Sequence, residues 1–331
     1  MHPFAKYIQI LGKGKNGMQS LSREQAYEAM QMITFYDVQP EQIGAFLMLM
    51  RVKEETAEEV AGFTQALRES LPSYGSDFTP AIDWAAYAGK KRQLPWFVLA
   101  ALVLAGRGYP VLMHGMNRSD NRVYVPLALD ALDMDTASSL KDAREQIDTT
   151  GFSYLPISKL SPLTTELLIT REIFGLRPPL HTVARMLNPF AAPLSVMGVF
   201  HPNFAEMHQQ ALVLLEQPNA LVCKGEGGEF ERIPDRNVDL YGVNKGECWE
   251  DTWNTILKTG GQVKPGRLNL NHFRAVWDGE EEDNYGEASV IGTLAMVIKA
   301  LGLESDAPAA HRMAQEWWWK RHHLDLDREA G

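Results

Sequence analysis

A cluster of basic residues stands where a predicted turn leads into a predicted helix. The basic residues are Lys90, Lys91 and Arg92, directly after a turn at Gly89. The segment 82–87 is predicted to be a strand, and a helix is predicted from Pro95 to about 106, because proline is tolerated in the first helical turn. Free N–H groups and the helix dipole favour an anion at such a position. The turn is therefore predicted to bind phosphate; a solvated, charged turn is the alternative.

A second polar segment follows the next predicted strand, at 111–113. Its residues are His114, Asn117 and Arg118, with Arg122 a little further on. The two strands and the helix between them make a βαβ unit, whose strands run parallel. Ligands of open parallel sheets bind at the carboxyl ends of the strands. Both polar segments are therefore expected to face one crevice.

A third candidate is the glycine-rich segment after a predicted strand at 220–223. It reads Lys-Gly-Glu-Gly-Gly-Glu-Phe-Glu over 224–231. Glycines let the backbone approach a ligand closely, and carboxylates are ligands of divalent cations. Glu229 and Glu231, together with Glu226, are candidate metal ligands. A glycine-rich turn with solvated acids is the alternative.

The elements that position these residues divide the chain into two parts. Residues 21–71 show three helical patterns with start signals at Ser22, Pro40 and Thr56. Strand and helix patterns alternate afterwards, which is typical of an α/β fold. The prediction is a small helical domain over 1–72 and a larger, mostly parallel-sheet α/β domain over 73–331.

Composition narrows the function further. The chain has 331 residues, a net charge of −10 and only two cysteines. The acidic balance disfavours unspecific binding to nucleic acid, although it allows a local basic patch. Two cysteines cannot form a disulfide framework. The longest apolar stretch, 96–105, is too short to span a membrane, and a cytoplasmic protein without membrane association is expected.

Several of these segments resemble the anthranilate phosphoribosyltransferases. Residues 21–71 closely resemble the N-terminal helical module of that family and of the related pyrimidine nucleoside phosphorylases. His114-Gly115-Met116-Asn117-Arg118 resembles the family's HGNR segment with one inserted methionine, and Gly175-Leu176-Arg177 with Asn188-Pro189 brackets a segment as long as its GIRT…TNP motif. The resemblance implies the family's fold and a pocket for the acceptor. Its residues would be Arg171, Arg177, His181 and Asn188.

The chain departs from the family at both phosphate-binding segments. The glycine-rich GTGGD turn, which binds the diphosphate of phosphoribosyl pyrophosphate with magnesium, is replaced by Ala88-Gly89-Lys90-Lys91-Arg92. The family binds magnesium with an Asp-Glu pair. This chain lacks one of the two carboxylates, whether Glu229 or Glu231 is aligned with that pair. Phosphoribosyl transfer needs a leaving group neutralised by metal and by fixed donors. Anthranilate phosphoribosyltransferase activity is therefore not expected.

A branch of the same superfamily fits the pattern better. The pattern LRxxxHTxxxxLNP, with Pro178 and His181, resembles proteins that lack this activity and bind single-stranded nucleic acid as homodimers. The resemblance implies binding of single-stranded DNA or RNA in a basic crevice, by a homodimer formed through the N-terminal helices. The alternatives are a phosphoribosyltransferase that uses phosphoribosyl pyrophosphate and Mg on another aromatic or base acceptor, and a scaffold that binds a small anion.

Overall fold

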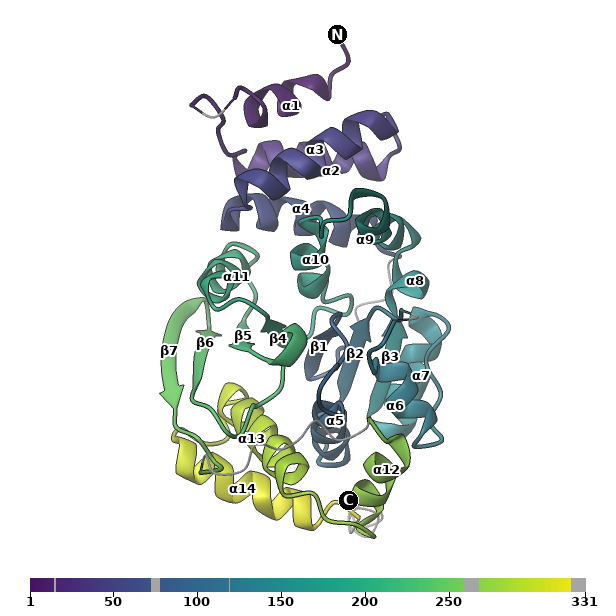
Figure 1. Ribbon diagram of the computed structural model, residues 1–331, viewed down its shortest axis with the longest axis vertical. Helices are drawn as coiled ribbons and strands as arrows, with labels where there is room; N and C mark the ends of the chain where they lie inside the picture. The colour runs from purple at the N-terminus through teal and green to yellow at the C-terminus, as the bar shows by residue number, and fades with distance from the viewer. Residues whose placement is uncertain (15, 73–77, 119, 259–267, 323–331) are drawn as a thin grey trace.

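The computed structural model describes residues 1–14, 16–72, 78–118, 120–258 and 268–322. Four N-terminal helices form one end of the molecule, and the last two helices lie at the opposite end (Figure 1). Among the helices described, none combines the length and apolar character that crossing a membrane requires.

The N-terminal helices are held by strong start signals. They are α1 (Ala5–Leu11), α2 (Arg23–Thr34), α3 (Pro40–Lys53) and α4 (Ala57–Ser70). Ser22 and Gln25 form the predicted capping box of α2, and Thr56 forms another with Glu59 at the start of α4. The sequence patterns predicted α2, α3 and α4 but not α1, which is too short for a clear helical period.

A seven-stranded sheet forms the larger part of the molecule. Its strand order is β3-β2-β1-β4-β5-β6-β7. The strands are β1 (Ile82–Ala86), β2 (Val111–Gly115), β3 (Phe152–Pro156), β4 (Leu194–Val199), β5 (Asn219–Lys224), β6 (Val238–Asn244) and β7 (Glu247–Trp253). The first five in the order are parallel, and β6 and β7 add an antiparallel edge. The predicted fold class, a helical domain with a mostly parallel α/β domain, is confirmed.

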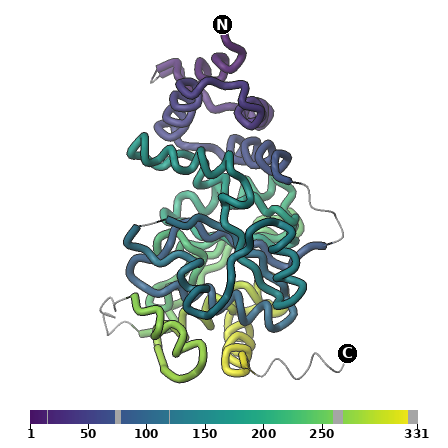
Figure 2. The backbone as a smooth tube through the Cα atoms, turned by 90° about the vertical axis from the view of Figure 1, so that its right-hand side faces the viewer, coloured from purple at the N-terminus to yellow at the C-terminus, as the bar shows by residue number. Residues whose placement is uncertain are grey.

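Helices cover both faces of the sheet (Figure 2). One face packs on α7 (Leu140–Thr150), α8 (Ile157–Leu160), α9 (Pro162–Phe174), α10 (Leu180–Val183) and α11 (Asn203–Leu214), in a core that continues into the N-terminal helices. The other face packs on α5 (Trp96–Gly106), α6 (Val125–Asp130), α12 (Leu270–Asp278), α13 (Asn284–Ala300) and α14 (Ala307–Trp319). Side chains along β1 alternate between the two cores, as the period of a strand requires. Two short 3-10 helices, η1 (Ala184–Met186) and η2 (Glu226–Gly228), complete the fold.

Some predicted elements differ from those observed. The helix expected over 122–134 is only α6, because Pro126 sets its first turn and Asp133 takes a positive φ of 55° shortly after its end. The segment 176–189, expected to be irregular, contains α10 and η1. The strands β6 and β7 were not predicted, since their polar, alternating residues resemble a loop at an exposed edge.

Candidate functional site

The turn between β1 and α5 is where the sequence predicts phosphate binding. The backbone N–H groups of Ala88 and Gly89 both donate to one carboxylate oxygen of Glu229, over 2.7 and 2.6 Å. Gly89 has a φ of +65°, a conformation that glycine adopts without strain. Glu229 is 1% exposed. The donors of the turn are therefore already bound to an anion, which is a side chain of the protein itself.

Two further glutamates bind the same turn and the start of α5. Lys90 is 1% exposed, and its Nζ lies 2.5 Å from Glu231 and 3.0 Å from Glu226. The second oxygen of Glu231 accepts the N–H of Phe97, and Glu226 accepts the N–H of Arg92, both over 2.9 Å. Burial alone would lower the pKa of Lys90, but the carboxylates of Glu231 and Glu226 outweigh it and raise that pKa.

The glycine-rich segment approaches the rest of the backbone rather than an open cavity. A Cβ on Gly198 would lie 2.2 Å from the carbonyl carbon of Glu229, and one on Gly225 would lie 1.7 Å from its carbonyl oxygen. Gly227, with a φ of +73°, faces the carbonyl of Gly89, which a Cβ would meet at 2.9 Å. These glycines allow the segment to press Glu229 against the 88–92 turn.

The carboxylates of this region do not suit magnesium. Mg²⁺ needs oxygen ligands in a near-octahedral arrangement with several waters. One oxygen of Glu229 and both oxygens of Glu231 already accept N–H groups, and the second oxygen of Glu229 is buried without a partner. No group of three or more His, Cys, Asp or Glu side chains in the described part of the chain is arranged to hold a metal ion.

The predicted residues after β2 divide between the core and the surface. His114 is fully buried, with Nδ1 2.8 Å from the Tyr87 hydroxyl and Nε2 3.2 Å from Asp83. Asn117 is exposed, and it lines a cavity of about 370 Å³ together with Arg118. Arg118 pairs with Glu172 over 3.1 Å. Asn117 and Arg118 can therefore reach a ligand, while His114 supports the sheet beneath them.

Arg122, another residue predicted to bind phosphate, supports the 88–92 turn. Its Nη1 donates to the carbonyl oxygens of Ala88 and Gly89, over 2.9 and 3.3 Å. The side chains of Lys91 and Arg92 are exposed. Only these two members of the basic triplet present their charge to solvent.

Five arginines interact electrostatically with Arg177, with His181 or with both, and Arg122 among them also contacts the turn. This arginine cluster consists of Arg118, Arg122, Arg171, Arg177 and Arg185. Burial, followed by the charges of Arg171, Arg185 and Arg122, lowers the pKa of Arg177 to about 10. Among the described residues, no carboxylate lies within ion-pair distance of Arg171 or Arg177. The charges of Arg171 and Arg177 are therefore not neutralised by an ion pair in the described part of the chain.

His181 lies within this field. Burial, followed by the charges of Arg185, Arg177, Arg171 and Arg118, lowers its pKa to about 3. The imidazole is therefore neutral at pH 7, and its Nε2 is buried without a hydrogen-bond partner. A neutral ring with a free nitrogen can exchange one hydrogen bond with a ligand but adds no charge.

A cleft pocket of about 160 Å³ lies between the end of α3 and the carboxyl end of β4. It is lined by Arg51, Arg177, His181, Arg185, Phe200, His201 and other residues of these segments. Phe200 is 54% exposed. Asn188, which the sequence places in the acceptor pocket, instead closes a local turn: its side chain bonds Ala192 in both directions and also Gln217.

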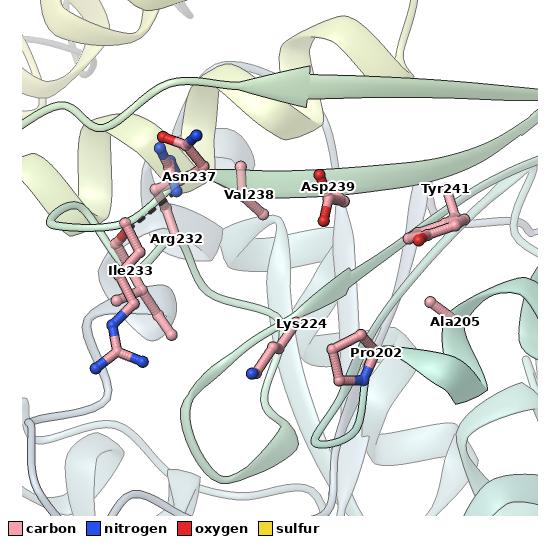
Figure 3. A pocket seen from close by; sticks show the side chains of 10 residues that line it. Pro202, Ala205, Lys224, Arg232, Ile233, Asn237, Val238, Asp239 and Tyr241 are labelled. Carbon is pink, nitrogen blue, oxygen red and sulfur yellow. Dashed lines mark hydrogen bonds between the residues drawn. The ribbon is translucent and has the colours of Figure 1, made fainter.

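A second pocket is lined in part by residues of the turn between β4 and α11. This strand-end pocket has a volume of about 210 Å³, and Figure 3 shows Lys224 between Pro202 and Ile233 within it. Lys224 and Arg236 line the pocket, and among the described residues neither side chain has a hydrogen-bond or ion-pair partner. Both pockets border the turn between β4 and α11, here called the rim, because His201 lines the first pocket and Pro202 the second.

Sequence reasoning missed several of these residues. Arg185 was not selected, although it follows His181 by four positions and so shares its face in a helical segment. Arg236 was not selected, because it precedes β6, a strand that was not predicted. Lys224 belongs to the glycine-rich segment after the predicted strand at 220–223, but only the glutamates of that segment were selected. Glu229 lies 141 residues from Ala88 in the sequence, so no local sequence pattern indicates that it binds the 88–92 turn.

Comparison with known proteins agrees with this architecture. Residues 5–71 match the glycosyl transferase family, helical bundle domain. The anthranilate phosphoribosyltransferase of Halobacterium salinarum is 29% identical over 235 residues, which are 70% of this chain and 68% of that protein. That of Desulfitobacterium hafniense is 27% identical over 248 residues, covering 75% and 69%.

Solved structures give the same result over nearly the whole chain. Anthranilate phosphoribosyltransferase from Thermus thermophilus superposes with a TM-score of 0.77 at 24% identity, covering 96% of this chain and 94% of that one. The Saccharomyces cerevisiae enzyme, in complex with PRPP and Mg, gives a TM-score of 0.76 at 15% identity, covering 97% and 96%. The chain therefore has the fold of these anthranilate phosphoribosyltransferases, and its residues 5–71 match the helical bundle domain of the glycosyl transferase family.

Proposed function

We propose that this protein binds single-stranded nucleic acid in the cleft bordered by the arginine cluster, and that it does not transfer phosphoribosyl groups to anthranilate. The observation that carries the proposal is the excess of guanidinium charge around His181. Arg171 and Arg177 have no carboxylate partner among the described residues, so a polyanion can bind them without displacing an internal ion pair. Guanidinium groups bind phosphate oxygens in pairs and with defined geometry.

The shape of the basic surface favours an extended ligand. The cleft pocket and the strand-end pocket both border one chain turn, at His201 and Pro202, and both are lined by cations. His201 and Pro202 are consecutive residues, so the two pockets border the same short segment of chain. Phe200 is exposed at this rim and offers an aromatic surface to a base. A flexible single strand can follow such a path, with phosphates in the pockets and bases on the rim.

The 88–92 turn argues against transfer from phosphoribosyl pyrophosphate. A diphosphate leaving group needs fixed N–H donors and a metal at the position where its charge develops. Glu229 and Glu226 occupy the N–H donors of this turn, and the Lys90 ammonium is paired with carboxylates. The carboxylates that could hold magnesium are the same groups, so they cannot serve both purposes.

A second candidate is a phosphoribosyltransferase with another acceptor. It is favoured by the resemblance to anthranilate phosphoribosyltransferases and by the position of Asn117 and Arg118, which line an open cavity at the carboxyl end of β2. In this alternative the two residues hold a ribosyl phosphate and Arg171 holds the acceptor.

We further propose that the protein is a homodimer formed through its N-terminal helices and the neighbouring α9. Phe174 of α9 lies against α3, where a Cβ on Gly44 would meet its ring at 3.7 Å. On the same helix Ile173 is 81% exposed and Ile169 is 46% exposed. An exposed apolar surface of this kind is typical of a surface that another protein chain covers.

The test is a fluorescence anisotropy titration with labelled single-stranded DNA and RNA at two salt concentrations, with phosphoribosyl pyrophosphate and magnesium as competitor. Salt-sensitive oligonucleotide binding that the competitor does not reverse is expected. No oligonucleotide binding, together with affinity for phosphoribosyl pyrophosphate, would favour the second candidate. Product formation from anthranilate and phosphoribosyl pyrophosphate would contradict the proposed absence of that activity.

The arginine cluster is tested by the double substitution Arg171→Ala with Arg177→Ala. Oligonucleotide affinity should fall for every sequence, and the slope of log K against log salt should fall in magnitude by about 0.7 for each phosphate that the variant no longer binds. Arg312→Ala is a matched control, because Arg312 is exposed on α14 at the opposite end of the molecule. If the double and the control substitutions lowered oligonucleotide affinity equally, the assignment of the cleft as the nucleic-acid site would be refuted.

A further inference from the structure

We infer that Glu229 determines which ligands this fold accepts, by acting as an internal occupant of an anion site formed by the 88–92 turn. Its carboxylate takes the two N–H groups that an anionic ligand would use, and a phosphate can bind there only when that side chain is absent. This inference goes beyond the proposed function, and it holds whether or not the protein binds nucleic acid.

The contacts of the turn support an anion site rather than an ordinary loop. Two consecutive N–H groups, of Ala88 and Gly89, converge on a single oxygen of Glu229. Convergent backbone donors of this kind make a concavity that binds anions. Arg122 fixes the backbone from the other side by binding the carbonyl oxygens of the same two residues, so the donors stay directed inward.

Glu229 forms no ion pair in the described part of the chain. Burial raises the pKa of this carboxyl, although Arg185 is near enough for its charge to oppose that effect. Lys90 is paired with Glu226 and Glu231, and Arg185 donates to the carbonyl of His181. The second oxygen of Glu229 is buried and has no partner in the described part of the chain. A carboxylate whose only role was to hold two loops together would be expected to accept hydrogen bonds with both of its oxygens. The Glu229 carboxylate instead has one oxygen bound to two converging N–H groups and one buried oxygen without a partner. A bound anionic ligand would have the same arrangement.

Removal of this carboxylate should therefore create a binding site. The variant Glu229→Ala is titrated with inorganic pyrophosphate and with inorganic phosphate by isothermal calorimetry, without a metal. It should bind pyrophosphate about tenfold more tightly than the wild-type protein or better, since one charge-assisted hydrogen bond to an amide is enough for that difference. Formate, which fits the vacated volume, should raise the melting temperature of this variant and leave that of the wild-type protein unchanged.

The matched control is Glu229→Gln. Glutamine removes the charge but keeps the oxygen that the two N–H groups need, so this variant should remain closed to pyrophosphate. Equal pyrophosphate binding by the Ala and Gln variants would show that charge removal is sufficient, and it would overturn the inference. Pyrophosphate affinity of a folded Ala variant no higher than that of the wild-type protein would overturn it as well. Glu229→Ser provides the same test if the Ala variant does not fold.

Oligonucleotide binding of the same variants separates this inference from the proposed function. The Ala variant should not lose oligonucleotide affinity, because all five guanidinium groups of the arginine cluster remain and a negative charge that opposes Arg185 is removed. A wild-type protein that binds no oligonucleotide, with an Ala variant that gains pyrophosphate binding, would refute the proposed function and support the role of Glu229.

Discussion

Lys90 illustrates how burial decides what a charged side chain can do. In the sequence it is the first of three basic residues and a candidate phosphate ligand, but the structure surrounds it with Glu226 and Glu231. Its neighbours Lys91 and Arg92 remain exposed. Three adjacent cations thus have two physical roles: one neutralises buried carboxylates, and two are available to solvent and to a ligand.

Replacement of Lys90 by methionine should destabilise the protein strongly. The substitution leaves two carboxylates near the core without a cation, and removal of one partner of a buried ion pair costs about 3–5 kcal/mol. Lys91→Met is the matched control, because its side chain is exposed, and its effect should stay within about 0.5 kcal/mol. Urea unfolding of both variants checks this prediction. Similar midpoints for the two variants would mean that the Lys90 pairs contribute little.

At the scale of elements, local signals located the helices well. Ser22 and Thr56 are start signals whose hydrogen bonds the structure confirms, and the apolar period of α4 follows directly from its sequence. The parallel strands were recognisable because both of their faces are buried, which gives continuous apolar runs. The edge strands β6 and β7 have one exposed face. Their polar residues interrupt the apolar runs by which the other strands were recognised.

The candidate site was less predictable than the elements that carry it. The sequence places the 88–92 turn and Glu229 each after the carboxyl end of a predicted strand, but it could not show that they bind each other. That contact depends on the closeness of two loops, which Gly198 and Gly225 allow by lacking a Cβ. Likewise, Asn188 matched a family motif, but its hydrogen bonds serve a local turn.

The joint between α12 and α13 should depend on pH. His272 of α12 binds Asp283, over 2.9 Å, and Glu281, both in the acidic segment before α13. The hydrogen bond that His272 donates to Asp283 is the largest cause that raises the pKa of His272 above its ordinary value; burial opposes it, and Glu281 adds to it. A raised histidine pKa contributes stability that is fully present below the unfolded value of about 6.5 and is lost as pH rises through the folded value.

The measurement is the free energy of unfolding of the wild-type protein and of His272→Gln between about pH 5.5 and 9, values chosen to bracket that window. The wild-type advantage should be largest at the acidic end and should shrink toward the alkaline end. Glu281→Gln, which keeps the Asp283 contact, should show a smaller pH-dependent decrease in stability. A difference between wild type and His272→Gln that is constant with pH would contradict the role of the charged imidazole.

At the scale of the whole molecule, the charges are separated in space. The net charge is −10, yet the arginine cluster and the two pockets lie at one edge of the sheet. The acidic segment 278–283 lies between α12 and α13, at the end of the molecule away from the N-terminal helices (Figure 1). Solution ions screen charges beyond a Debye length of about 8–10 Å, so distant acids weaken binding in the cleft only slightly at physiological salt. Net charge alone is therefore a poor guide to what this protein binds.

The proposed homodimer gives the last prediction, because it would bring two clefts into one particle. Ile173→Glu places a charge on the exposed apolar face of α9, and it should convert a dimeric wild-type protein into a monomer in sedimentation velocity experiments. Leu127→Glu is the matched control: Leu127 is 42% exposed on α6, away from the N-terminal helices, and its substitution should leave the dimer intact. The monomer should keep its affinity for short oligonucleotides and bind long ones more weakly, because only a dimer can bind one strand with two clefts. A wild-type protein that sediments as a monomer, or an Ile173→Glu variant that remains dimeric, would exclude this surface as the interface.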